Sequence, residues 1–254
     1  MRTDVHRPGG SCIEKDKKVG QGFSLAINNL KRLYKTKKKD IAARLKEFRQ
    51  AGRKGSEEDI FAELCFCLLT PQSKALNCWD AVCVARKKGL LRSGCESSIA
   101  EILRGKVRFH NHKASYIVAA RKLFSENGRL KIKEKLQNII QPLKALNTLR
   151  FLSELSGKKS CRELLVRNVK GMGYKEASHF LRNIGSGKDI AILDRHILKN
   201  LKALRVIREI PDTLTEKKYF EIEGRMRDFS KRTGILLEVL DLLFWSTQTG
   251  HIFK

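Results

Sequence analysis

The stretch from Asn168 to Leu198 reads NVKGMGYKEASHFLRNIGSGKDIAILDRHIL. It predicts the end of one helix, a glycine-containing hairpin at 170–173 and a second helix from about Tyr174 to Ile184. Gly185 predicts the stop of that helix, because glycine tolerates the left-handed conformation of many helix ends. The N–H groups of the hairpin and of the following helix start point outward and suit an anion. One face of the second helix is apolar at helical spacing and consists of Ala177, Phe180, Leu181 and Ile184.

Two residues of this stretch indicate chemistry as well as binding. Lys175 lies in the first turn of the second helix, and a neutral lysine is a nucleophile toward carbonyl-like carbons. Asp194 lies just before an apolar-periodic run that starts at Ile197. Because Asp is a preferred N-cap, we expect Asp194 to open a helix with its carboxylate at the helix start. The non-catalytic alternative is a DNA-binding hairpin in which Lys175 is one more phosphate contact.

The composition indicates a polyanionic partner. The chain has 53 Lys plus Arg against 27 Asp plus Glu, a formal net charge of +26. Nucleic acid is the commonest partner for such a surface. A ribosomal or chromatin-type packing protein shares this charge but rarely has so regular a helical pattern. No membrane partner is expected, because the sequence has no long apolar segment.

The motif GMGYKEA at 171–177, followed by ILDRH at 192–196, resembles the helix-hairpin-helix and Gly/Pro...Asp superfamily of DNA glycosylases. More narrowly, it resembles the 8-oxoguanine DNA glycosylase/lyases found mainly in archaea. The phrase ELCFCLLTPQSKA at 63–75 is similar to the helix that opens the glycosylase core in this superfamily. The resemblance implies that Lys175 is the nucleophile of a bifunctional enzyme and that Asp194 is its other catalytic residue.

The expected fold is all-α, since the chain shows helical periodicity and no convincing strand. The resemblance implies two helical lobes around a cleft, with the helix-hairpin-helix motif in one of them. Residues 57–194 would form this core lobe. Residues 22–56 and 195–254 would form the terminal lobe, and the two catalytic residues would meet at the cleft.

The resemblance also implies a base pocket made of Phe109, Trp245 and Lys254. An exposed Phe109 in the loop before a helix would stack on the damaged base, and Trp245 would pack against it from the other side. The carboxylate of the chain-terminal Lys254 would accept hydrogen bonds from a flipped oxidised guanine. Three alternatives without a function in the base pocket stay open. Phe109 packs its loop against the core, Trp245 belongs to the core, and Lys254 is a frayed chain end.

The expected DNA contacts come from the hairpin and from the start of the next helix. In the hairpin they are Lys170, Gly171 and Gly173. His196, two residues after Asp194, is a weaker candidate. A hydrogen bond from the His196 imidazole to the Asp241 carboxylate could hold His196 toward a phosphate, and an ordinary surface His and Asp is the equal alternative.

The N-terminal part of the chain is strongly basic. Residues 1–54 hold 16 Lys or Arg against 5 Asp or Glu, a net of 16 − 5 = +11. Residues 1–21 lack apolar periodicity and are expected to be a flexible basic tail. An amphipathic helix is expected from Phe23 to Tyr34, with the run KTKKKD at 35–40 just after it. This run reads equally well as a solvated surface and as extra, sequence-independent DNA affinity.

The seven cysteines do not predict a metal centre. No CxxC occurs, so a structural zinc or an iron–sulfur cluster is not expected, and no cofactor is required for the chemistry. A structural alkali cation in the hairpin is implied by the family alone. The odd number of cysteines without a secretion signal indicates an intracellular protein of the cytoplasm or nucleoid.

These observations together predict a monomeric DNA repair enzyme. It would flip 8-oxoguanine out of double-stranded DNA, excise it through a Schiff base on Lys175 and nick the strand by β-elimination. One alternative is a glycosylase/lyase for other oxidised bases. The other is a non-catalytic helix-hairpin-helix protein that only binds DNA.

Overall fold

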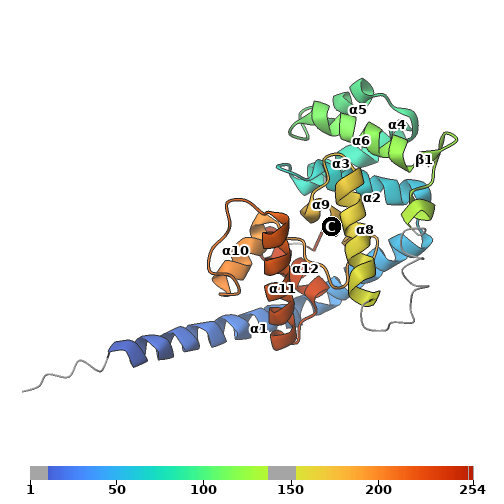
Figure 1. Cartoon of the computed structure of the whole chain (residues 1–254). Helices are drawn as coiled ribbons and strands as arrows, with labels where there is room; N and C mark the ends of the chain where they lie inside the picture. Colours follow the sequence, from blue (N-terminus) through green and yellow to red (C-terminus); the bar gives the residue numbers. More distant parts are fainter. Residues whose placement is uncertain (1–10, 137–152, 251, 254) are drawn as a thin grey trace, which may run out of the picture.

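The computed structural model describes residues 11–136, 153–250, 252 and 253. These residues are almost entirely helical (Figure 1), so the predicted all-α class is confirmed. The elements are, in chain order, α1 (Ser11–Lys54), α2 (Glu57–Leu69), α3 (Ala75–Lys87), α4 (Leu90–Ser93), α5 (Glu96–Leu103), α6 (His110–Phe124), β1 (Ser125–Glu126), β2 (Arg129–Leu130), α8 (Ser153–Asn168), α9 (Tyr174–Asn183), α10 (Arg195–Ala203), α11 (Glu216–Thr233) and α12 (Leu237–Thr249).

A small hairpin of two strands is the one departure from helix that the sequence reading missed. β1 and β2 pair antiparallel, with Ser125 opposite Leu130. Asn127 and Gly128 make the turn, both with positive φ (49° and 74°). An Asn-Gly pair is a strong hairpin signal because both residues accept this conformation. The signal was hidden because each strand is only two residues long, too short for alternation to be visible.

The first hydrophobic core is built around α2. Every residue of this helix from Ile60 to Leu69 is buried, which fits its apolar composition on all sides. Its start is fixed by a capping box, in which Ser56 accepts from the backbone N–H of Asp59 and the Asp59 carboxylate accepts from the backbone N–H of Ser56. Helices α3, α5, α6, α8 and α9 add further buried side chains to the same core.

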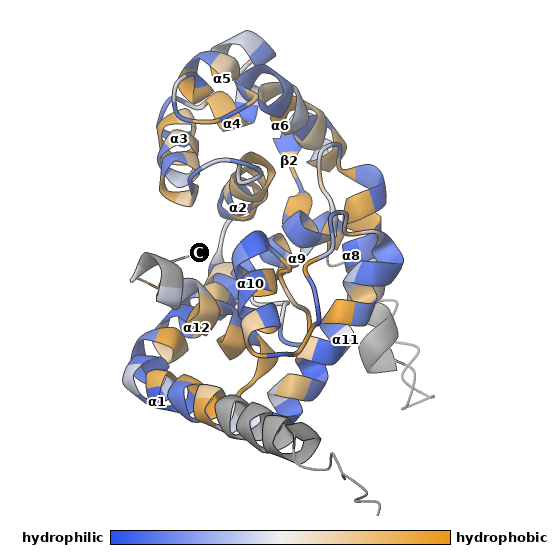
Figure 2. Ribbon diagram, turned by 90° about the vertical axis from the view of Figure 1, so that its left-hand side faces the viewer, coloured by the Kyte–Doolittle hydropathy of each residue, from blue (hydrophilic) through white to orange (hydrophobic). Residues whose placement is uncertain are grey.

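A second hydrophobic core joins the two ends of the chain. Ile41, Leu45 and Phe48 of α1 pack there with Met226 of α11 and Leu240 of α12. Figure 2 shows hydrophobic residues alternating with hydrophilic ones along α1, as expected for a helix with one buried face. The exact lobe boundaries at 22–56, 57–194 and 195–254 stay a prediction.

Helix α1 is much longer than predicted. The expected helix ended at Tyr34, but α1 continues without a break through KTKKKD to Lys54. It also begins at Ser11, so residues 11–21 of the expected flexible tail are helical; residues 1–10 lie outside the described part. The run continues because lysine is a good helix former and no Pro or Gly lies between 23 and 51. Neither α1 nor any other described helix has an apolar stretch long enough to cross a membrane.

A buried ion pair connects the two cores. The Arg162 guanidinium on α8 donates to both carboxylate oxygens of Glu223 on α11, at 2.7 and 3.0 Å, and both side chains are almost fully buried. The same carboxylate accepts from the backbone N–H of Ala191 at 2.8 Å. Desolvation of this pair is compensated by the bidentate geometry and the added hydrogen bond. The pair therefore fixes α8, α11 and the segment before α10 relative to one another.

Candidate active site

The helix-hairpin-helix motif forms where it was predicted. Helix α8 ends at Asn168 and α9 begins at Tyr174. Gly171 has φ +81°, and a Cβ added there would lie 2.2 Å from the ring of Tyr116 on α6. Only glycine fits this close approach with this backbone conformation. The Lys170 ammonium lies 6.0 Å from the centre of the same ring, so the hairpin is seated on α6.

The N-terminus of α9 has an internal partner. Gly173 is the N-cap residue, and its N–H donates to Glu176 Oε2 at 3.2 Å. One N–H of the predicted anion site thus already has an acceptor within the protein, while the DNA contact of Gly173 stays a prediction. The reason is local: a glutamate three residues after the cap reaches back to it, as in a capping box. Sequence reasoning missed Glu176, although its spacing from Gly173 is the signal.

Lys175 lies in the first turn of α9, with 23% of its side chain exposed. Its Nζ forms an ion pair with Glu176 Oε1 at 2.8 Å and donates to Thr70 Oγ1 at 3.4 Å. Thr70 is the C-cap of α2. The amine is thus half-buried where the start of α9 meets the end of α2.

A second lysine, Lys113 on α6, holds the turn that follows α2. Its buried Nζ donates to the carbonyls of Leu69 and Pro71 at 2.7 and 2.6 Å and to Ser73 Oγ at 3.1 Å. Desolvation lowers the pKa of this amine to about 8. Sequence reasoning missed this role; the available signal was that Lys113 falls on the apolar face of α6, with Ile117 and Phe124.

Asp194 is the N-cap of α10, as predicted. Its Oδ1 accepts from the backbone N–H of Ile197 at 2.8 Å. Its Oδ2 accepts from Trp245 Nε1 on α12, also at 2.8 Å. The structure thus brings two predicted site residues, Asp194 and Trp245, into direct contact. Among the described residues, no hydrogen bond or ion pair links Lys175 to Asp194.

The backbone just before Asp194 is held by Tyr219 of α11. The Tyr219 hydroxyl donates to the carbonyl of Ala191 at 2.7 Å and accepts from the N–H of Leu193 at 3.3 Å. Burial raises the pKa of Tyr219, so the hydroxyl keeps its proton. Sequence reasoning missed this residue, because an aromatic at an apolar position of a helix usually reads as core.

Replacing Tyr219 by Phe should slow catalysis without weakening DNA binding. The change leaves a buried carbonyl and a buried N–H without their partner, a cost of about 1–3 kcal/mol, and loosens the backbone that places Asp194. We expect the single-turnover rate of base excision to fall roughly tenfold, while the Kd for DNA stays unchanged. Tyr116→Phe is the control, because it keeps the ring against Gly171. A loss of thermal stability with an unchanged excision rate would contradict the positioning role.

His196 packs on Trp245 and not on Asp241. The two rings lie 5.3 Å apart at an interplanar angle of 61°. Asp241 is instead paired with Arg182 of α9 at 3.2 Å, so the predicted His196–Asp241 hydrogen bond is wrong. Asp241 is on the buried side of α12, where Arg182 is its partner. Burial raises the pKa of Asp241 to about 6, although the positive charge of Arg182 lowers it. The predicted phosphate contact of His196 stays a prediction.

Phe109 is exposed at the start of α6. The residue is 53% exposed, so the alternative in which Phe109 packs onto the core and closes its loop is wrong. The backbone is left-handed (φ 56°, ψ 40°), which is uncommon for a residue other than glycine. The Arg108 guanidinium lies 5.4 Å from the centre of the Phe109 ring. An exposed aromatic beside a cation is suited to stacking on a base.

The described end of the chain contacts both cores. Ile252 packs on the second core, and the Phe253 ring lies 6.3 Å from that of Phe66 on α2 in an edge-to-face arrangement. Lys254 lies outside the described residues. The base pocket of Phe109, Trp245 and Lys254 is therefore still a prediction.

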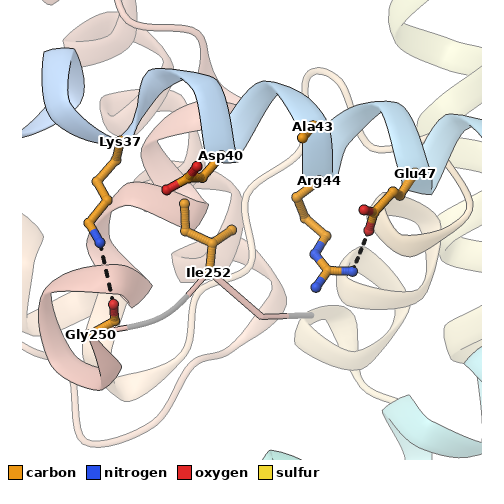
Figure 3. Close-up of a pocket in the computed structure, with 7 residues that line it drawn as sticks. All are labelled: Lys37, Asp40, Ala43, Arg44, Glu47, Gly250 and Ile252. Carbon is orange, nitrogen blue, oxygen red and sulfur yellow. Dashed lines mark hydrogen bonds and ion pairs between the residues drawn. The ribbon is translucent and has the colours of Figure 1, made fainter.

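A shallow pocket of about 390 Å³ lies between α1 and the C-terminal segment. Figure 3 shows its polar lining, with Lys37 Nζ donating to the carbonyl of Gly250 and Arg44 paired with Glu47. None of the predicted site residues lines it. In the described part of the chain, no group of three or more His, Cys, Asp or Glu side chains is arranged to hold a metal ion.

Comparison with known proteins gives one consistent result. Residues 41–235 match the Ogg-HhH family model, described as 8-oxoguanine DNA glycosylase. A protein of Fusobacterium nucleatum named 8-oxoguanine DNA glycosylase/AP lyase is 44% identical over 90% of this chain and 97% of its own length. A protein of the same name from Methanocaldococcus jannaschii is 36% identical over 91% of this chain and all of its own length.

Solved structures agree with the sequence relatives. The crystal structure of the 8-oxoguanine DNA glycosylase of Thermotoga maritima has a TM-score of 0.74 and 33% identity, and covers 91% of this chain and all of its own. The Methanocaldococcus jannaschii 8-oxoguanine glycosylase/lyase in complex with a 15mer DNA containing 8-oxoguanine has a TM-score of 0.72 and 35% identity. It covers 91% of this chain and all of its own length.

Proposed function

The chain belongs to the 8-oxoguanine DNA glycosylase family, and from that membership we propose that Lys175 and Asp194 carry out its chemistry on oxidised guanine in double-stranded DNA. It is a bifunctional enzyme, a DNA glycosylase and AP lyase. The observation that carries the assignment of residues is the position of the two side chains. Lys175 follows the hairpin in the first turn of α9, and Asp194 caps the start of α10.

The first step of the mechanism is attack on the sugar. The damaged nucleotide is flipped out of the duplex, and Lys175 Nζ forms a bond to C1′ while the bond from C1′ to the base breaks. The electron pair of that bond leaves with the base, which takes up a proton. Positive charge develops on the sugar, and the Asp194 carboxylate stabilises it. Before attack, Lys175 has to exchange its contacts with Glu176 and Thr70 for the substrate.

The second step cuts the strand. The bond between Lys175 and C1′ becomes a Schiff base when the sugar ring opens. Loss of a proton from C2′ then expels the 3′ phosphate by β-elimination. Hydrolysis of the Schiff base finally frees Lys175. This sequence uses an amine, a carboxylate and water.

Base recognition is proposed for Phe109 and Trp245. Phe109 supplies an exposed ring, and base–aromatic stacking contributes about 1–3 kcal/mol per base. The indole N–H of Trp245 donates a hydrogen bond to the Asp194 carboxylate. The ring that contacts the base is therefore also connected to the catalytic carboxylate. A mispositioned base would therefore disturb the carboxylate as well as lose stacking.

The choice of lesion is tested by base release. Duplexes with one 8-oxoguanine opposite cytosine or one thymine glycol opposite adenine are incubated with excess enzyme, and free base and strand nicks are both counted. We expect equal yields of base and nick from the first duplex, and a rate at least about 100-fold lower on the second. Equal rates on both would favour the alternative of a lyase for other oxidised bases. Binding with neither product would favour a non-catalytic DNA-binding protein.

A further inference from the structure

Helix α1 carries an exposed basic face that the proposed chemistry does not use. We call five exposed lysines of this helix the α1 basic face: Lys31, Lys35, Lys38, Lys39 and Lys46. Within the described chain, no hydrogen bond or ion pair engages their side chains.

Helical geometry places these five lysines on one side. At 3.6 residues per turn they fall within an arc of about 100°. The acidic side chains of this segment, Asp40 and Glu47, lie on another side and border the pocket shown in Figure 3. The apolar residues Ile41, Leu45 and Phe48 point into the second core. Charge is thus segregated along α1, and the basic face holds no acidic residue.

The length and position of this face suit an extended polyanion. From Lys31 to Lys46 the helix rises about 22 Å, at 1.5 Å per residue. Duplex DNA carries one phosphate charge per roughly 1.7 Å of its axis, so several phosphates can face the lysines at once. In Figure 1 α1 runs along the edge of the molecule, and only its N-terminal part extends past the other helices. The five lysine side chains are exposed, so they are accessible to a DNA backbone.

We propose that the α1 basic face binds the sugar–phosphate backbone of duplex DNA outside the segment held at Lys175 and Asp194. The proposal rests on the proposed function, because it takes the substrate duplex as the polyanion. An anionic membrane is a poorer fit. An interfacial helix inserts its apolar side into the lipid, whereas the apolar side of α1 at Ile41, Leu45 and Phe48 is buried in the protein.

The test replaces all five lysines of the α1 basic face by glutamine. Glutamine has a helix propensity close to that of lysine, so α1 should keep its structure. The Kd for a lesion duplex is measured against salt concentration with a long duplex of about 40 base pairs and a short one of about 12. On the long duplex we expect the slope of log K against log salt to shrink by about 2 to 4, since each phosphate contact contributes about 0.9. Affinity should fall roughly 10- to 100-fold.

The control carries the same loss of charge elsewhere. Five exposed lysines outside α1 are replaced by glutamine, and the salt slope on the long duplex should stay close to that of the wild type. This control set is Lys87, Lys88, Lys122, Lys217 and Lys231.

Three results would overturn the proposal. These are an unchanged slope in the α1 variant, an equal change in the control set, or an equal loss on the short and long duplexes. The single-turnover excision rate on the short duplex reports separately on the proposed function. If the wild-type enzyme excises no base from the lesion duplex, the proposed function is refuted. The salt slopes still decide whether the α1 basic face binds DNA.

Discussion

Replacing Lys175 by Gln is expected to abolish base excision and strand nicking while DNA binding survives. Gln is one atom shorter than Lys, but it has a similar helix propensity and keeps a polar group near Thr70 and Glu176. It cannot form a Schiff base. The single-turnover rate of excision from an 8-oxoguanine duplex should fall by at least about a thousandfold. The Kd for the same duplex should change by less than about threefold, because a single partly exposed charge is lost.

Lys170→Gln is the matched control for this experiment. Lys170 belongs to the same hairpin and carries the same charge, but its ammonium lies over the Tyr116 ring. Its loss should weaken DNA binding a little, lower the salt slope by about one and leave the excision rate at saturating enzyme unchanged. If Lys175→Gln behaved like Lys170→Gln in both assays, Lys175 would be a phosphate contact and not a nucleophile.

Replacing Asp194 by Asn should give the second largest loss. Asn is as good an N-cap residue as Asp, so α10 should still form. It is neutral, however, and cannot stabilise positive charge on the sugar. It also has one acceptor oxygen where Asp194 uses two, so it cannot accept from both Ile197 and Trp245. We expect the excision rate to fall by roughly 10²–10³ and the free energy of unfolding to fall by about 1–3 kcal/mol, the cost of the lost hydrogen bond.

A second N-cap residue separates capping from chemistry. Thr215 caps α11 by accepting from the backbone N–H of Lys218 at 3.3 Å. Thr215→Ala should lower the stability of that helix by about 1 kcal/mol and leave excision unchanged. A loss of excision in Thr215→Ala as large as that in Asp194→Asn would show that helix stability, and not the carboxylate charge, sets the rate.

Local sequence patterns were sufficient to predict the helix-hairpin-helix motif and the start of the helix that follows it, α10. Gly171 and Gly173 mark the hairpin, and the start of α10 at Asp194 follows from capping preference. The apolar composition of α2 on all sides accounts for its central place in the core. These features depend on interactions within a few residues, which spacing reveals directly. The family resemblance, which rested on the same motifs, is confirmed by the comparisons.

The contacts that organise the candidate site were not predictable in the same way. Trp245 and Asp194 are 51 positions apart in the sequence. Lys113 is more than 40 positions from the residues at the end of α2 to which it donates hydrogen bonds. Such contacts depend on how the helices pack, which periodicity does not specify. The same limit explains the wrong pairing of Asp241, since spacing gives the face of a helix but not its neighbour. The length of α1 was missed because a lysine run reads as a surface loop as easily as a helix.

The measurement that tests the central claim most directly is the identification of the residue that becomes attached to DNA. Wild-type enzyme is reacted with an 8-oxoguanine duplex in the presence of borohydride, which reduces a Schiff base to a stable amine. The covalent adduct is then digested with a protease and its DNA-linked peptide sequenced. We predict one adduct, with the DNA attached at Lys175, and none in Lys175→Gln. An adduct at another lysine, or excision and nicking without any adduct, would contradict the account.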